Sequence, residues 1–184
     1  MNPQRLYPRS PTAEYRDLRL VSAMQLSRFL SDKTPVVRTL RFLARKNIIG
    51  ASSAIFEIWK KQLYSDPDIF FHYMSGTQLE RSNYHYFGIS PDEAFERLSD
   101  AANLKSLFAM SWLALIYDGV VMDKANIKSA AYWYRQASVE GCPYAQFNLA
   151  SAIQAGKIEP NSEQELGDLL DHIFSSDLDV FWVN

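Results

Sequence analysis

The chain has 184 residues, of which 47% are hydrophobic and 22% charged, and its formal net charge is −2. This length can bury a sizeable core in one domain, and the composition is that of a globular protein rather than a disordered one. The charge is unevenly spread: residues 1–50 hold ten Lys/Arg against three Asp/Glu (+7), and residues 51–184 hold nine against eighteen (−9). Such an asymmetry indicates either a basic arm for an acidic partner or neutralisation of one half by the other.

The single cysteine, Cys142, excludes an internal disulfide and a multi-cysteine metal site. The first nine residues lack the apolar stretch of a secretory signal. The longest nearly apolar run, residues 107–117, is shorter than the roughly 20 residues of a membrane-spanning helix. We therefore expect a cytoplasmic protein with no membrane span.

The first part of the chain predicts helices that follow no regular spacing. Their patterns cover residues 12–30, 35–47, 51–64 and 67–81. Thr34-Pro35 and Asp66-Pro67 each combine an N-cap residue with a proline suited to the first turn, and Gly50 predicts a stop. No strand-like alternation competes, so we expect an all-α chain. Residues 1–89 would form a helical extension, either a degenerate repeat or a cap.

The second part of the chain carries one pattern twice. Four positions of the first copy recur 36 residues later in the second: Ala94, Ala101, Ala109 and Leu113 become Ala130, Ala137, Ala145 and Leu149. A fixed period of this size is typical of stacked helical hairpins, which mainly present a binding surface. We therefore expect an α-solenoid of two to three hairpin repeats over residues 90–184, with a C-terminal cap. It would form one continuous domain with residues 1–89.

Helix starts recur with the same spacing, which supports the repeat independently. Ser90 to Glu93 is a capping box, Asn126 is a good N-cap residue, and Ser162 with Glu165 is a second capping box. Residues 90, 126 and 162 are 36 apart. The predicted helices cover residues 91–102, 105–118, 127–139 and 143–155, with one more from about 163.

These residues resemble the Sel-one-like repeat, a relative of the tetratricopeptide repeat. The matching positions are Lys128, Ala130, Trp133, Tyr134, Ala137, Gly141, Ala145 and Leu149. The chain departs from the family pattern at Ala114 and Ala150, where the family has glycine, at Lys105, which replaces the inter-helix glycine, and at Ile153. The resemblance covers residues 90–160. It implies a helical-hairpin fold and an adaptor role, or, as in some small bacterial members, an immunity protein that neutralises a cognate toxin.

Few residues combine into a pattern that carries chemistry. His72, His85 and His172 are scattered, and Cys142 occupies the turn between two repeat helices. There is no glycine-rich phosphate loop and no hydrolase motif. The sequence therefore predicts no catalytic residue, no cofactor and no metal site, and we expect a protein that is not an enzyme.

The helix from Pro35 carries a basic stripe, because Arg38, Arg41 and Arg45 are spaced i, i+3 and i+7. Phe42 lies toward the same side, and the residues opposite would pack inward: Val36, Leu40, Leu43 and Ala44. A stripe of this kind is either a solvated face, a contact for a protein partner, or a site for nucleic acid or anionic lipid.

We expect this stripe to join exposed positions of the repeat helices in binding another protein. The candidate positions are Met110, Ser111, Asp118, Gln146, Asn148 and Gln154. The alternative function is binding of nucleic acid or another anionic surface through the basic N-terminal half.

Overall fold

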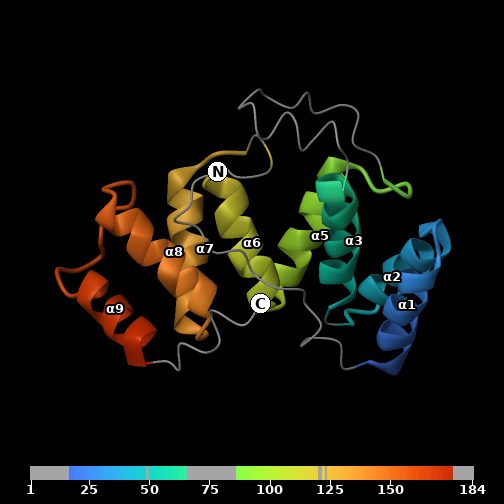
Figure 1. Cartoon of the computed structure of the whole chain (residues 1–184), viewed down its shortest axis with the longest axis horizontal. Coiled ribbons are helices and arrows are strands. Elements are labelled where there is room, and N and C mark those ends of the chain that lie inside the picture. Colours follow the sequence, from blue (N-terminus) through green and yellow to red (C-terminus); the bar gives the residue numbers. More distant parts are fainter. Residues whose placement is uncertain (1–16, 49, 66–85, 120–121, 123, 176–184) are drawn as a thin grey trace. The chain divides into compact units, whose positions relative to one another are not determined.

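The computed structural model describes residues 17–48, 50–65, 86–119, 122 and 124–175. These residues form eight helices, and their only β-type pairing is a single bridge between Tyr86 and Ile89 (Figure 1). The helices are α1 (Leu18–Phe29), α2 (Thr34–Arg45), α3 (Ala51–Ser65), α5 (Pro91–Asn103), α6 (Leu107–Tyr117), α7 (Ile127–Val139), α8 (Pro143–Gln154) and α9 (Glu165–Ser175). The all-α prediction is confirmed for these residues. The helix predicted over residues 67–81 lies outside the described residues.

Side chains that accept backbone N–H groups set two helix starts as predicted. The Ser90 hydroxyl accepts from the Glu93 N–H at 3.1 Å, and the Asn126 side-chain oxygen accepts from the Ser129 N–H at 3.1 Å. Such a bond satisfies one of the N–H groups left without a helical partner in the first turn.

The N-cap predicted at Thr34 and the capping box predicted at Ser162 are wrong, and α1 begins at Leu18 rather than at residue 12. Thr34 is already the first residue of α2, and its N–H is accepted by the Asp32 carboxylate at 2.8 Å. α9 begins at Glu165 rather than directly after Ser162. The Glu165 carboxylate accepts the backbone N–H of Asn161 at 2.6 Å, so it closes the preceding turn instead of serving a helix that starts after Ser162.

Four described helices end with the same backbone geometry. α2, α5, α7 and α8 each close on a residue in the left-handed region: Asn47 (φ 52°), Lys105 (φ 64°), Gly141 (φ 81°) and Gly156 (φ 67°). The N–H of that residue bonds to the carbonyl three residues back at 2.9 Å, and the next N–H bonds to the carbonyl five residues back at 2.9–3.2 Å. These two bonds define a Schellman motif.

The spacing of the motifs that end α2, α5 and α7 differs along the chain. Lys105 and Gly141 are 36 residues apart, as the repeat requires, whereas Asn47 precedes Lys105 by 58 residues. The same helix end therefore occurs in the part of the chain where the sequence shows no 36-residue spacing.

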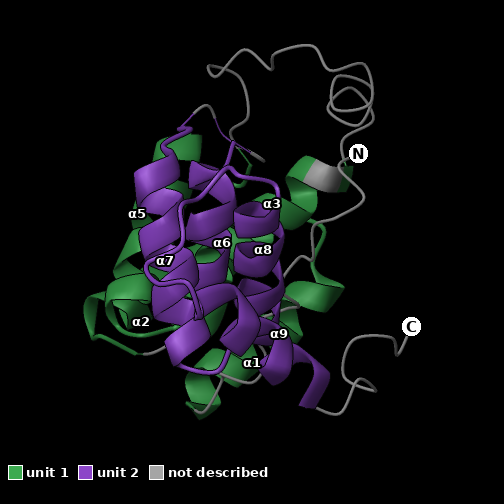
Figure 2. Cartoon of the chain, turned by 90° about the vertical axis from the view of Figure 1, so that its left-hand side faces the viewer, with its two compact units in different colours: residues 1, 9–109 green, residues 2–8, 110–184 purple. Residues whose placement is uncertain are grey.

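The chain divides into two compact units, residues 1 and 9–109 and residues 2–8 and 110–184 (Figure 2). In the first unit α1 packs on α2, α2 on α3, and α3 on α5. In the second unit α7 packs on α8, and α8 on α9. Helices that follow one another in the chain thus pack as hairpins, which is consistent with the predicted helical-hairpin architecture.

The core of the first unit is built around α3, in which every residue from 51 to 60 is buried. The ring of Phe56 lies 6.0 Å from that of Trp59 and 6.2 Å from that of Phe108, distances at which aromatic pairs attract. From α2, Val36, Leu40 and Leu43 are buried as predicted, whereas Ala44 is half-buried.

Small residues occupy the core of the second unit, as predicted. Ala130 and Ala137 of α7 and Ala145 of α8 are fully buried. Side chains of this size let two helices approach closely. Tyr134 and Leu149 fill the remaining space and are also buried.

Candidate partner-binding surfaces

The outward face of α2 combines positive charge with an exposed aromatic ring. Arg38, Arg45 and Lys46 are exposed, and Phe42 is 55% exposed between them. The Lys46 ammonium lies 6.0 Å from the centre of the Phe42 ring, at the limit of a cation–π contact. We call Arg38, Phe42, Arg45 and Lys46 the basic–aromatic face of α2.

A hydrogen-bonded carboxylate anchors the start of that helix. Asp32 accepts from the backbone N–H of Thr34 at 2.8 Å. A hydrogen bond with the Thr34 side chain, together with this backbone bond, holds the pKa of Asp32 below its ordinary value, with a smaller contribution from the charge of Arg38. Opposite the basic–aromatic face, Val36, Leu40 and Leu43 attach α2 to the rest of the first unit. The face is therefore presented on a helix that is fixed at its start and along its length.

Arg41 does not belong to this face, contrary to the predicted stripe. Its guanidinium donates to both carboxylate oxygens of Glu93, at 2.7 and 2.6 Å, and to the carbonyl of Gly88 at 2.8 Å. The hydrogen bond to Glu93 raises the pKa of Arg41, so the group stays charged. Arg41 therefore links α2 to the start of α5, and Arg38 and Arg45 are the arginines of the predicted stripe that stay on the exposed face.

A second arginine makes the same arrangement in the second unit. Arg135 of α7 donates to both carboxylate oxygens of Glu165 at 2.7 and 2.9 Å, and to the carbonyl of Glu159 at 2.8 Å. The bond from Arg135 is the main reason that the pKa of Glu165 lies below its ordinary value. Glu93 and Glu165 are 72 residues apart, which is two periods of 36. The sequence did not predict either link, because the arginine and the glutamate of each pair lie in different helices.

Three positions proposed as exposed contacts on the repeat helices are buried instead. Met110 and Ser111 of α6 and Asn148 of α8 have almost no exposed surface. The Ser111 hydroxyl lies 3.0 Å from the Cys142 sulfur, inside the second unit. α6 is apolar around its whole circumference, so its sequence pattern does not show which side faces outward.

The other three positions of that set reach the surface to different degrees. Asp118 is half-buried and accepts from the Tyr134 hydroxyl at 3.1 Å. Gln146 is half-buried and donates to the Ser138 carbonyl at 3.3 Å. Gln154 is exposed at the end of α8. Of the six positions, Gln154 is thus the one best placed to touch another molecule.

In comparisons with family models, curated proteins and solved structures, nothing matched this chain. The surfaces themselves are therefore the guide to function.

Charged side chains also lie inside the first unit. Glu57 and Lys60 of α3 are both buried, with Nζ of Lys60 2.7 Å from Oε2 of Glu57, though without the alignment of a hydrogen bond. Nζ of Lys61 lies 3.2 Å from the other carboxylate oxygen. Burial lowers the pKa of Lys60, and the charge of Glu57 opposes that shift. Because each charge has a partner inside the fold, this cluster is a structural element of α3.

Within the described part of the chain, no three His, Cys, Asp or Glu side chains are placed to hold a metal ion. His172 is exposed on α9, and Cys142 is buried beside Ser111. His72 and His85 lie outside the described residues. No described helix has both the length and the apolar composition needed to cross a bilayer.

Apolar side chains that the sequence did not single out are exposed at several helices. Leu18 and Phe29 lie on α1, Tyr132 and Val139 on α7, and Phe174 on α9. They form no complete amphipathic pattern of their own, so periodicity alone could not mark them as surface residues.

Proposed function

We propose that this protein is a non-enzymatic interaction module made of helical hairpins, and that the basic–aromatic face of α2 binds an acidic surface of a partner protein. The observation that carries the proposal is the exposure of Arg38, Phe42 and Arg45 on one face, while the arginine between them, Arg41, is used inside the fold. Arginine and aromatic side chains dominate the binding energy of many protein interfaces, because they combine large contact area with directed hydrogen bonds.

The hairpin geometry supports a repeat architecture that includes the first hairpin, α2 and α3. The Schellman motifs of α2, α5 and α7 and the two arginine–glutamate links recur at equivalent helix positions, whereas the fourth motif ends α8. In this proposal residues 32–65 are the first repeat, and the connection to the next repeat is 22 residues longer than elsewhere (58 − 36 = 22). An insertion of this length explains why no constant spacing is visible before residue 90. Stacked hairpins bury a continuous core and leave helix faces free for a partner.

The Sel-one-like resemblance over residues 90–160 gives the proposal its narrower form. It favours a cytoplasmic adaptor, or a bacterial immunity protein that binds one cognate toxin. The two versions differ in stoichiometry, since an immunity protein binds a single partner one to one, whereas an adaptor joins several.

A second candidate function is binding of a nucleic acid at the same face. Arg38, Arg45 and Lys46 around an exposed ring would suit a phosphate backbone with stacked bases, and such binding weakens steeply as salt rises.

Affinity purification with matched charge reversals tests the proposal. We expect the wild-type chain to retain a partner that the double variant Arg38→Glu/Arg45→Glu loses. The control Lys128→Glu/Lys157→Glu changes the charge equally at exposed positions of the second unit and should retain it. Retention of the same proteins by both double variants would overturn the assignment of the face.

Titration of labelled single-stranded RNA and DNA at low salt separates the two functions. Tight binding that is lost in Arg38→Glu/Arg45→Glu and falls with added salt would replace the protein partner by a nucleic acid. Equal, weak binding by the wild type and both double variants would leave the protein partner as the function.

A further inference from the structure

The side of α5 that is equivalent to the basic–aromatic face of α2 carries the opposite charge. The two helices end in the same motif 58 residues apart, and 58 residues after Arg38 and Phe42 the chain has Glu96 and Asp100. Glu96 is exposed, and Asp100 keeps 47% of its side-chain surface. We call Glu96 and Asp100 the acidic face of α5. The first unit thus presents a positive and a negative face at matching helix positions.

The bond between Arg41 and Glu93 brings these two faces together. Residues three and four positions apart are neighbours on a helix surface, so Arg41 adjoins Arg45 on α2, and Glu93 adjoins Glu96 on α5. The guanidinium of Arg41 donates to both carboxylate oxygens of Glu93 at 2.7 and 2.6 Å, and the two faces therefore meet at this pair. Neither Arg45 nor Glu96 forms an ion pair with another residue in the described part of the chain, so both charges remain on the surface.

The spacing along α2 favours a helical segment of the partner over an extended one. Arg38 and Arg45 are seven residues apart, which separates them by about 10.5 Å along the helix axis, with Phe42 between them. Carboxylates seven residues apart on a second helix have the same separation. Residues on one side of a strand are about 7 or about 14 Å apart, so they do not match both arginines at once.

We propose that the partner protein binds through a helix with two charged stripes, and that this helix lies where the basic–aromatic face of α2 meets the acidic face of α5. Its carboxylates pair with Arg38 and Arg45, and an apolar side chain between them covers Phe42. Its lysines or arginines face Glu96. This inference deepens the proposed function and rests on it, because it uses the same face of α2.

Two adjoining faces of opposite sign determine both the choice and the direction of the bound helix. A helix that carries only carboxylates gains nothing from the acidic face, and like charges at a contact oppose association. Turning a two-stripe helix end for end exchanges the sides on which its stripes lie, so its carboxylates would then meet Glu96. The acidic face therefore selects one direction, which a positive face alone cannot do.

Binding of synthetic helical peptides to the purified full chain tests the proposal. The two-stripe peptide is a stapled helix of about 18 residues with two glutamates seven positions apart, a leucine between them, and a lysine directly after each glutamate, about 100° around the helix. The single-stripe peptide has glutamine in place of both lysines. A third peptide is an unstapled two-stripe peptide with two central prolines, which prevent a helix. Fluorescence anisotropy at low salt gives the three affinities.

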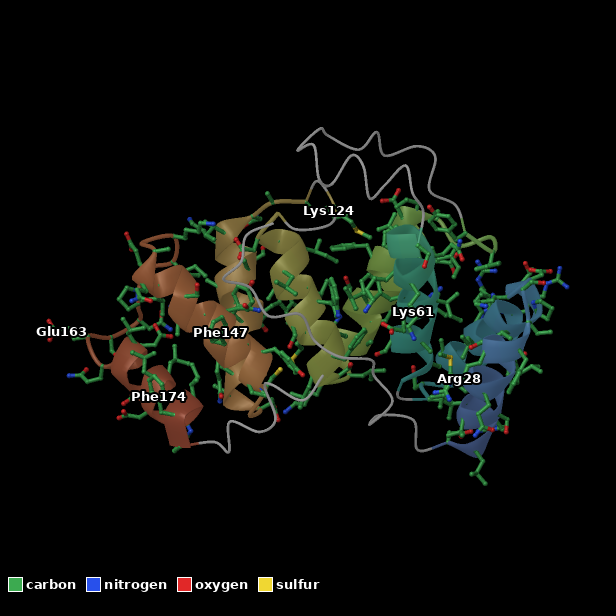
Figure 3. The ribbon with its side chains drawn as sticks, in the orientation of Figure 1. Arg28, Lys61, Lys124, Phe147, Glu163 and Phe174 are labelled. Atoms are coloured by element: carbon green, nitrogen blue, oxygen red, sulfur yellow. The ribbon has the colours of Figure 1, made fainter. Side chains whose placement is uncertain are left out.

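The wild type should bind the two-stripe peptide at least about threefold more tightly than the single-stripe peptide or the proline peptide, because exposed ion pairs contribute modestly to binding. Glu96→Lys should lose the preference for two stripes. The matched control Glu163→Lys should keep it, since Glu163 is exposed in the second unit, at the turn before α9 (Figure 3).

Reversal of the arginines should weaken both stapled peptides. We expect Arg38→Glu/Arg45→Glu to lower their affinities by at least about tenfold, because both glutamates lose their partners and meet like charge. The matched control Lys128→Glu/Lys157→Glu should bind as the wild type does. Far-UV circular dichroism should be the same for all variants, since each replaces exposed side chains.

Several results would overturn the two-stripe helix. These are no binding of either stapled peptide, equal affinity for both, a preference that survives Glu96→Lys, or a proline peptide that binds as tightly as the helix, which would indicate an extended segment. The proposed function is judged separately, on the partner retained in affinity purification. If Arg38→Glu/Arg45→Glu loses that partner and Glu96→Lys keeps it, the basic–aromatic face stands and its extension onto α5 fails. If the arginine reversals keep the partner, the proposed function itself fails.

Discussion

Arg41 and Glu93 stand 52 residues apart in the sequence, yet two hydrogen bonds of 2.7 and 2.6 Å join them. A bidentate pair of this kind fixes orientation as well as distance between two helices. Arg135 and Glu165 repeat the arrangement in the second unit. Ser99 lies 36 residues before Arg135, and Ser129 lies 36 residues after Glu93, so the equivalent positions of the intervening repeat both hold serine. The arginine and the glutamate are therefore present together or absent together.

Removal of the Arg41–Glu93 pair should destabilise the first unit. Both side chains are mostly buried, at 29% and 20% exposure, so solvent screens the pair less than a surface pair. We expect Arg41→Met and Glu93→Gln each to lower the free energy of unfolding by about 1–3 kcal/mol, with a coupling of about 1 kcal/mol or more in the double variant. Urea unfolding measures both. Arg38→Met, on the exposed side of the same helix, is the control and should have almost no effect.

The link between Arg135 and Glu165 should make stability depend on pH. In the folded chain the pKa of Glu165 lies below its ordinary value of 4.5, mainly because Arg135 donates to it. The ionised Glu165 carboxylate therefore contributes fully to the free energy of unfolding above pH 4.5. This contribution is lost as the pH falls through the lower pKa of the folded state. Unfolding curves of Glu165→Gln and the wild type should differ most near neutral pH and converge in acid. Glu163→Gln, at an exposed neighbouring position, should follow the wild type, and a constant difference at all pH values would contradict this role.

Lys105 holds a backbone conformation that favours glycine. Its φ of 64° places it in the left-handed region, as does Gly141 at the equivalent helix end. We expect Lys105→Gly to raise the free energy of unfolding by about 0.5–1 kcal/mol, and Gly141→Ala to lower it by about 1 kcal/mol. A Cβ at Gly141 would meet nothing within 4 Å, so that loss would come from the backbone alone. Thermal unfolding of the two variants checks the opposite signs.

The features that could be predicted from the sequence are those determined by neighbours in the chain. The caps at Ser90 and Asn126 depend on residues three positions away, and the burial of Ala130 and Ala137 follows from helical periodicity. The start of α9 could not be predicted, because the Glu165 carboxylate is taken by Arg135 and by the N–H of Asn161 rather than by a local capping box.

The candidate surface could be predicted only in part, for a similar reason. Helical spacing places Arg38, Arg41 and Arg45 on one stripe. Which of them is free depends on Glu93, and no local pattern contains that partner. The turn at Asn47 could not be predicted from the 36-residue repeat, because Asn47 lies 58 residues before Lys105.

The burial of Met110 gives a direct test of which residues of the repeat helices form surface. Met110 is 3% exposed, whereas Gln154 is exposed at the end of α8. A lysine at a buried site loses its hydration without gaining a partner, so Met110→Lys should lower the free energy of unfolding by at least about 2 kcal/mol. Gln154→Lys should change it by less than about 0.5 kcal/mol. Urea unfolding of both variants gives the comparison. Equal tolerance of the two changes would place Met110 at the surface and return it to the set of residues that can touch a partner.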